Sequence, residues 1–215
     1  MTQLLRIQNL MVSNDGYGSG VGQSLERPFG HANPAELAAW AGATANWPNR
    51  ADPGGTRGLD DYFTRDFKNN IGAEIMGRNK FGPQRGPWED LEWQGWWGDV
   101  PPFHTPVFVL THHPRPSFTL DDTTFHFIDA TPEEALATAR EAADGKDVRL
   151  GGGVATVREF LDADLVDTMH AAVVPGVELG DGERLWNSPE DLLDRFHLEN
   201  VQSASGIVHH IFWRR

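Results

Sequence analysis

The chain has 215 residues, no cysteine, and 31 acidic residues against 18 basic ones, which gives a formal net charge of −13. A chain of this length can bury a core of its own as one domain, and without cysteine it has no disulfides and no thiolate metal ligands. The acidic balance argues against nucleic acid or an anionic membrane as a partner, because both bind basic surfaces.

The N-terminal part is predicted to hold a buried strand followed by a long loop. Residues 4–12 are apolar enough for that strand, and residues 13–20 form a Gly-rich loop. Residues 20–58 are rich in Gly, Pro, Asn and Ala, which is typical of a long functional loop. Within it, Asn33 as N-cap and a proline at the first helical position predict a short helix at 34–40.

The next segment combines a helix, a strand and an aromatic loop. Apolar residues recur at helical spacing over residues 59–70, which predicts a helix. Residues 71–76 form a short strand, residues 77–80 begin another helix, and residues 81–102 form a loop rich in Trp. Its tryptophans are Trp88, Trp93, Trp96 and Trp97. They either line a flat aromatic substrate pocket by stacking, or form a hydrophobic flap packed on the core or on a second subunit.

The C-terminal half alternates strands with helices. Thr131 and Glu134 form a capping box with Pro132 at the first helical position, so we expect a helix to about residue 143. A second helix follows three glycines and ends at about Leu161. The predicted strands are residues 107–110, 124–128, 146–150 and 166–174, and a terminal hairpin pairs residues 195–202 with 207–213.

This alternation predicts the fold class. Strands that alternate with helices form a mostly parallel sheet flanked by helices, and the terminal hairpin adds an antiparallel edge. We therefore predict one α/β domain over residues 1–215, with long insertions at about 17–58 and 82–105.

The most informative motif is the run Gly151-Gly152-Gly153, between an apolar strand and a helix. Glycines let a bulky group approach bare backbone, and the N–H groups and dipole of a helix N-terminus favour an anion, commonly phosphate. A tight strand-to-helix turn without a ligand explains the same residues. Both interpretations remain open on this segment alone.

Two other strand ends have a similar position. Met76-Gly77-Arg78 offers bare backbone and a guanidinium, and Thr111-His112-His113 offers a hydroxyl and two imidazoles. The carboxyl ends of parallel strands meet in one crevice, where open α/β folds bind their ligands. The three strand ends together predict a clamp for a nucleotide with several phosphates.

The order of these segments resembles the dihydrofolate reductase-like superfamily, particularly the riboflavin-biosynthesis reductase (RibD C-terminal) domain type. The matching pieces are Ser13-Asn14-Asp15-Gly16 after the first strand, Glu74-Ile75-Met76-Gly77-Arg78, the strand from Val107 to Thr111, the triple glycine, and Val173-Val174-Pro175 with Leu179-Gly180. The likeness covers nearly the whole chain. The chain departs from that pattern at Asn14, where a bulkier apolar residue is usual, and in the length of the loop that follows.

The resemblance implies a dihydrofolate reductase-like fold and NADPH as the cofactor. The residues that would hold the adenosine and its 2′-phosphate are Gly77, Arg78 and Asn79, with Thr111, His112 and His113. Those that would hold the pyrophosphate are Gly151, Gly152, Gly153, Val154 and Ala155. The nicotinamide would lie beside the first strand, near Leu10 to Val12 and Asp15-Gly16.

Two acids are candidates for the proton path of such a reductase. Asp15 lies in the loop after the first strand, although an Asp-Gly turn needs no catalytic role. Classical folate reductases carry an acid on the helix before the Met-Gly-Arg strand, where this chain has Asp60 or Asp61. Acids in a first helical turn also favour the helix dipole without any substrate. Asp15 is the first candidate and Asp61 the second.

No metal site is predicted, because the adjacent pairs His112-His113 and His209-His210 would point to opposite faces of a strand. The leading hypothesis is a cytoplasmic NADPH-dependent oxidoreductase, similar to 5-amino-6-(5-phosphoribosylamino)uracil reductase. It would transfer hydride to a C=N or C=O group of a small planar conjugated substrate. The alternatives are a non-catalytic nucleotide-binding protein, or a flavin- or deazaflavin-dependent oxidoreductase. We expect a small-molecule substrate, no nucleic acid or membrane partner, and a possible homodimer.

Overall fold

The structure, a computed structural model, describes residues 2–48 and 54–215. Residue 1 and residues 49–53 belong to the predicted domain and its first insertion and lie outside the described residues. The strands are β1 (Leu5–Ser13), β2 (Tyr17–Ser19), β3 (Ile71–Gly77), β4 (Val107–Leu110), β5 (Phe118–Leu120), β6 (Thr123–Ile128), β7 (Asp147–Leu150), β8 (Thr168–Val174), β9 (Glu183–Arg184), β10 (Phe196–Gln202) and β11 (Val208–Arg214). The helices are α1 (Pro34–Gly42), α2 (Leu59–Arg65), α3 (Arg78–Phe81), α4 (Pro132–Ala142) and α5 (Val154–Asp162), with 3₁₀ turns η1 (Asp66–Lys68) and η2 (Pro189–Leu192).

Within the described ranges, nine strands form one sheet in the order β10-β11-β8-β1-β7-β3-β4-β6-β5. The pairs from β8 through β1, β7, β3 and β4 to β6 are parallel. At one edge the β10–β11 hairpin joins β8 antiparallel, and at the other β5 pairs antiparallel with β6. The predicted α/β class, with a mostly parallel sheet and an antiparallel terminal hairpin, is confirmed. Sequence reasoning missed the short strands β2, β5 and β9.

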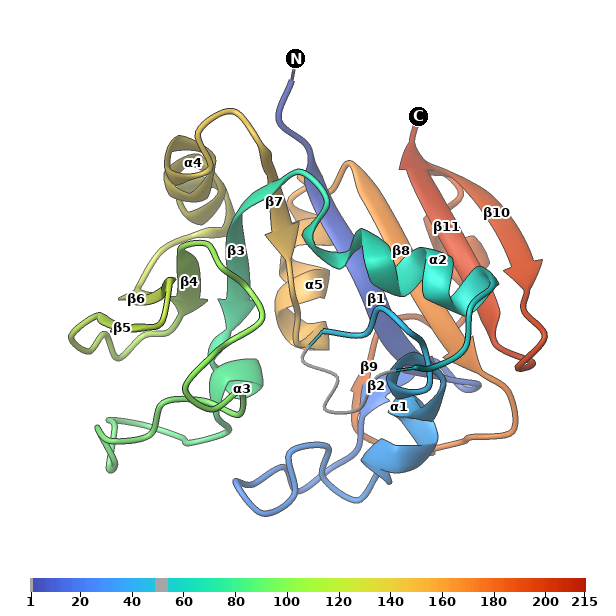
Figure 1. The fold of residues 1–215 in the computed structure, drawn as a ribbon, viewed down its shortest axis with the longest axis horizontal. Coiled ribbons are helices and arrows are strands. Elements are labelled where there is room, and N and C mark those ends of the chain that lie inside the picture. Colours follow the sequence, from blue (N-terminus) through green and yellow to red (C-terminus); the bar gives the residue numbers. More distant parts are fainter. Residues whose placement is uncertain (1, 49–53) are drawn as a thin grey trace.

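Helices cover both faces of this sheet, with α2 in front of it and α5 behind it (Figure 1). The strands alternate their side chains between the two faces. On β3, for example, Ile75 joins the core cluster that includes residues of α4 and α5, whereas Met76 joins an aromatic cluster with Phe81 and Phe125. The core on the face of α4 and α5 includes fully buried apolar residues of β1, β3 and β7, among them Leu5, Ile75 and Leu150, and so positions the loops that follow these strands.

The local signals for helix starts are confirmed. Asn33 accepts a hydrogen bond from the backbone N–H of Ala35, and Thr131 and Glu134 complete both halves of a capping box. The predicted helix at 59–70 is shorter, because α2 ends at Arg65 and gives way to η1. In the part of the chain that the structure describes, no helix is long and apolar enough to cross a bilayer.

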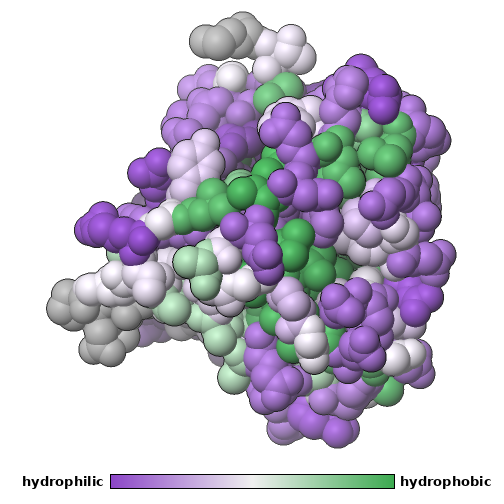
Figure 2. All heavy atoms as spheres, turned by 90° about the vertical axis from the view of Figure 1, so that its right-hand side faces the viewer, coloured by the Kyte–Doolittle hydropathy of each residue, from purple (hydrophilic) through white to green (hydrophobic). Residues whose placement is uncertain are grey.

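The side of the molecule that carries β10 and β11 mixes hydrophobic with hydrophilic residues (Figure 2). Two of its larger apolar side chains, Val201 and Trp213, are more than one-third exposed. An antiparallel edge strand such as β10 can pair with another chain. The predicted homodimer stays a prediction.

Candidate functional site at the strand ends

A pocket of about 980 Å³ lies where β3, β4 and β7 end. Its walls include all three strand ends singled out in the sequence: Gly77, Arg78 and Asn79; Thr111, His112 and His113; and Gly151, Gly152, Gly153, Val154 and Ala155. The expected meeting of these distant segments therefore occurs. Their role in binding stays a prediction.

The glycine loop and the end of β3 pack closely against each other. The backbone N–H of Gly77 donates to the carbonyl of Gly152 at 2.8 Å. A Cβ atom on Gly77 would lie 2.1 Å from the hydroxyl of Thr156, so only glycine fits there. Gly152 has a φ of +102°, a left-handed conformation that glycine adopts without strain, and its peptide bond to Gly153 is cis.

Helix α5 presents an uncapped N-terminus to this pocket. Its N-cap is Gly153, which has no side chain to accept from the first N–H groups, and its first turn holds no acidic residue. A Cβ atom built on Gly153 would meet no described atom within 4 Å. Free N–H donors, a helix dipole and open space together fit a phosphate group.

Beneath the glycine loop lies a buried cluster of charges. Glu74 contacts a guanidinium nitrogen of Arg149 at 3.2 Å and the amine of Lys80 at 3.4 Å. Lys80 also donates to the carbonyl of Gly151 at 2.7 Å. Burial lowers the pKa of Lys80 to about 8, although Glu74 opposes that shift. Two cations against one carboxylate leave an excess of positive charge, which favours an anion in the pocket.

Sequence reasoning missed this cluster. Its signal was the one charged residue of the buried strand β3, Glu74, beside a buried strand β7 that carries Arg149 together with Asp147. Charged side chains are almost never buried unless they are paired. The two positions could therefore have been matched to each other once β3 and β7 were recognised as neighbours.

Arg78 holds unused donors at the pocket wall. Its Nη1 donates to the carbonyl of Gly86, and its guanidinium lies over the ring of Trp88 at 3.9 Å. Its Nε and Nη2 are buried and have no hydrogen-bond partner among the described residues. Burial also lowers the pKa of this guanidinium. A planar cation with two unpaired donors suits a phosphate oxygen pair.

The aromatic loop both packs on the core and contributes to the pocket wall. Trp88, Trp93 and Trp96 each donate an indole N–H to a backbone carbonyl, those of His113, Phe81 and Lys80 respectively. Trp88 also packs edge-on against core phenylalanines, as the flap hypothesis predicts. Trp96 and Trp97 line the pocket, as the pocket hypothesis predicts, whereas Trp88 and Trp93 do not.

The two candidate acids lie outside the pocket wall. The carboxylate of Asp15 accepts hydrogen bonds from Ser13 and from the backbone of Leu179 and Gly180. Burial raises its pKa, but these hydrogen bonds outweigh burial and lower the pKa overall. Such a carboxylate fastens one loop to another and does not readily hold a proton. The role of Asp15 in the proton path stays a prediction.

Asp61 is only 5% exposed, and its carboxylate accepts from the backbone and side chain of Asn46. It thus fastens α2 to the loop after α1. Val12 is fully buried in the core, and Gly16 lies against Trp186. Of the residues expected beside the nicotinamide, Leu10 and Met11 line the pocket, and Gly18 and Ser19 line it as well.

The adjacent histidines of each pair contact different partners. His112 contacts Asp129 at 2.9 Å, and the backbone N–H of His113 donates to the hydroxyl of Thr111. His209 bonds to Asp60, whereas His210 bonds to Asn200. Elsewhere, His104, Asp121 and Asp122 bring three ligand atoms within 4.8 Å of one another at the exposed surface.

The chain is similar to members of a known protein family. A model of the RibD C-terminal domain matches residues 9–208. A putative riboflavin biosynthesis protein from Shewanella sp. PV-4 has a similar structure, with 20% identity, a TM-score of 0.57 and 99% of each chain covered. At that identity the likeness concerns the fold alone.

Two further solved structures are similar to this chain over 99% of its length. Dihydrofolate reductase from Enterococcus faecalis, complexed with NADP(H), has 13% identity, a TM-score of 0.49 and 96% of its chain covered. A pyrimidine reductase-like protein from Corynebacterium diphtheriae has 14% identity, a TM-score of 0.48 and 92% covered. No curated protein sequence matches the chain.

Proposed function

Because the chain belongs to the RibD C-terminal domain family, we propose that it is an NADPH-dependent reductase with a small planar conjugated substrate. Membership of this family supports an oxidoreductase of the riboflavin-reductase type. The finer statement is that a C=N or C=O group of the substrate accepts a hydride, which NADPH supplies when bound.

The observation that carries this proposal is the meeting of three strand ends at one pocket. The unpaired donors of Arg78, with Asn79 and the segment 111–113, would hold the adenosine and its 2′-phosphate. The backbone of residues 151–155 and the N-terminus of α5 would hold the pyrophosphate. The charge excess of Lys80 and Arg149 over Glu74 would favour the same anion.

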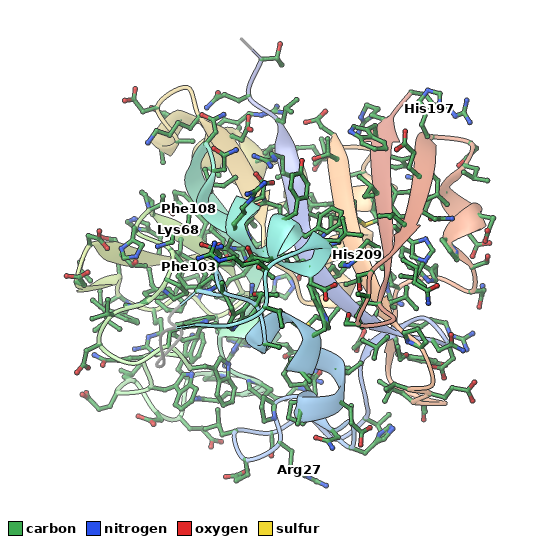
Figure 3. The ribbon with its side chains drawn as sticks, turned by 45° about the vertical axis from the view of Figure 1, so that its right-hand side comes forward. Arg27, Lys68, Phe103, Phe108, His197 and His209 are labelled. Carbon is green, nitrogen blue, oxygen red and sulfur yellow. The ribbon has the colours of Figure 1, made fainter. Side chains whose placement is uncertain are left out.

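Titration with four cofactors tests the proposal. NADPH, NADH, a flavin mononucleotide and a deazaflavin are added separately, and the emission of Trp96 and Trp97 in the pocket wall reports binding. We expect NADPH to bind about tenfold more tightly than NADH, because only NADPH carries the 2′-phosphate that Arg78 can hold. Arg78→Met should remove this preference, whereas Arg27→Met, at an exposed loop position labelled in Figure 3, should keep it.

Two results would overturn the proposal. One is that neither nicotinamide cofactor binds at millimolar concentration, and the other is that only the flavin or the deazaflavin binds. A nucleotide-binding protein without turnover is the second candidate, and the placement of Asp15 and Asp61 outside the pocket favours it. Steady consumption of NADPH with any member of a pterin, pyrimidine and quinone panel would exclude that candidate.

The affinity for NADP⁺ should fall as the pH rises through about 8. Lys80 has its pKa lowered to about 8 by burial, so it is charged below that pH and neutral above it. Loss of its charge removes one cation from beneath the phosphate-binding loop, which should weaken binding by about tenfold. Isothermal titration calorimetry between pH 7 and pH 9.5 measures the change.

Two variants show whether Lys80 is responsible. Lys80→Met should bind NADP⁺ weakly at every pH in this range, with no step near pH 8. Lys68→Gln removes the same charge from an exposed position, labelled in Figure 3, and should retain the step. If the affinity of Lys80→Met for NADP⁺ also falls near pH 8 by the same factor, another group causes the fall.

A further inference from the structure

Arg78 lies in the pocket wall, and among the described residues no carboxylate forms an ion pair with it. Arg149, in the same wall, is by contrast paired with Glu74 at 3.2 Å. Burial lowers the pKa of the Arg78 guanidinium, and no neighbouring charge offsets that effect. A cation that is poorly solvated and unpaired gains free energy when an anion reaches it.

The donors of this guanidinium are nevertheless out of reach of a ligand. Its Nη1 donates to the carbonyl of Gly86. Its Nε and Nη2 are buried and have no hydrogen-bond partner among the described residues. Buried donors are almost always hydrogen-bonded, so two unpaired donors on one charged group are exceptional. A phosphate in the pocket cannot contact the pair Nε and Nη2 in this position, and the Arg78 side chain has to turn before it can bind one.

The ring of Trp88 holds the guanidinium in this position. The long connection between α3 and β4 carries Trp88 and runs beside α3 (Figure 1). The guanidinium carbon of Arg78 lies 3.9 Å from the ring centroid of Trp88. A cation this close to an indole face is stabilised, most strongly where water is excluded. This stacking and the hydrogen bond to Gly86 therefore compete with a ligand for the same cation.

Trp88 is itself anchored to the protein core. Its indole N–H donates to the backbone carbonyl of His113. Its ring packs edge-on against Phe81 and Phe127, with centroid distances of 5.9 and 5.5 Å. Because the indole is held from several sides, the long side chain of Arg78 is the partner that can move.

We propose that Trp88 limits the preference of this pocket for a 2′-phosphorylated nucleotide, because it holds the Arg78 guanidinium in a position that the phosphate cannot use. Such a nucleotide binds only the fraction of molecules in which Arg78 has left the ring, and its apparent affinity is reduced by that fraction. A nucleotide without the 2′-phosphate needs no such movement. This inference rests on the proposed function, which assigns Arg78 to the 2′-phosphate.

Replacing Trp88 with leucine should therefore strengthen NADPH binding by about fivefold, the effect of losing a partly desolvated cation–π contact in the free protein. The affinity for NADH should stay that of the parent, so the preference for NADPH should grow from about tenfold to about fiftyfold. Trp88→Phe keeps an aromatic face that binds cations less strongly, and its preference should lie between those of the parent and Trp88→Leu. Isothermal titration calorimetry measures all of these affinities.

Two controls show whether the effect passes through Arg78. Trp93 belongs to the same loop and also donates its indole N–H to a backbone carbonyl, but no stacking or hydrogen bond joins it to Arg78 among the described residues. Trp93→Leu should keep the preference of the parent. In an Arg78→Met background, Trp88→Leu should change neither affinity, because the side chain that it releases is gone.

Chemical labelling measures the restraint on Arg78 without any cofactor. Phenylglyoxal reacts with accessible guanidinium groups, and mass spectrometry of peptides gives the rate at each arginine. In the parent Arg78 should react slowly, because two of its three guanidinium nitrogens are buried. In Trp88→Leu it should react faster, by about the same factor as the gain in NADPH affinity. Arg27, an exposed position labelled in Figure 3, is the reference and should react equally in both proteins.

Three results would each overturn this role of Trp88: NADPH binding that is unchanged or weaker in Trp88→Leu, an equal gain in the Arg78→Met background, or an unchanged labelling rate of Arg78. The outcomes also separate this role from the proposed function. If the parent prefers NADPH but Trp88→Leu does not strengthen its binding, only the role of Trp88 is rejected. If neither nicotinamide cofactor binds the parent, the proposed function and the coenzyme preference fail together, and the labelling alone shows whether Trp88 restrains Arg78.

Discussion

Replacing Ala155 with aspartate should weaken NADPH binding by about 100-fold or more and leave the folded protein at least as stable as the parent. Ala155 is the second residue of α5 and lines the pocket at the helix N-terminus. A carboxylate there interacts favourably with the helix dipole, by about 0.3–1 kcal/mol, but it occupies the place of the phosphate and repels it. Calorimetric titration measures the affinity, and thermal unfolding measures the stability.

A matched variant distinguishes this local effect from added negative charge. Ala35 is the second residue of α1, exposed and outside the pocket wall, so Ala35→Asp puts the same charge at the same helix position elsewhere. It should bind NADPH like the parent. Ala155→Asn, which is similar in size to the aspartate variant but neutral, should lose much less affinity than Ala155→Asp. Equal affinities in Ala155→Asp and Ala35→Asp would show that the N-terminus of α5 does not hold the phosphates.

Replacing Glu74 with glutamine should destabilise the protein by about 3–5 kcal/mol, the usual cost of removing one partner from a buried ion pair. Glu74 is 1% exposed and is the carboxylate that faces both Arg149 and Lys80. Without it, the buried guanidinium of Arg149 and the partly buried amine of Lys80 lose the carboxylate that they share. Urea unfolding at pH 7 measures the loss, and Glu141→Gln, at an exposed position of α4, is the control that should unfold like the parent.

The destabilisation by Glu74→Gln should be smaller at pH 9 than at pH 6. The pKa of Lys80 in the parent is about 8, already below the usual value, and loss of Glu74 lowers it further because Glu74 stabilises the charged form. Lys80 of the variant therefore loses its proton at a lower pH than Lys80 of the parent does. Between these two pH values the variant becomes more stable relative to the parent, and the difference stops changing once the amine of the parent is also neutral. If Glu74→Gln destabilises the protein equally at both pH values, then the charge of Lys80 does not contribute to the loss of stability.

Local sequence signals predicted the elements that depend on neighbouring residues. The Asn33-Pro34 helix start and the Thr131-Glu134 capping box need no tertiary contact, and both formed as expected. Elements decided by distant partners were harder to predict. The helix expected over 59–70 ends early at a place where Asp66 contacts Arg6 and Gln8, both on β1.

Some features of the site could likewise be predicted from the sequence, and others could not. The glycine loop meets the ends of β3 and β4 because these strands are parallel, so this meeting could be predicted. The environments of Asp15 and Asp61 could not be predicted. Gly180, which contacts Asp15, is remote in sequence, and Asn46, which contacts Asp61, belongs to no recognised motif. The β-bulge of β1 also could not be predicted, because it exists only as a shift in register between Ile7 and Leu10 where β1 pairs with β8.

The contact between Gly77 and Thr156 limits how coenzyme preference could be engineered in this scaffold. Even with Thr156 shortened to alanine, a methyl group at position 77 would lie 3.2 Å from the remaining Cβ. A mutant library should therefore leave this pair unchanged and randomise Arg78 and Asn79, which line the pocket without supporting the glycine loop.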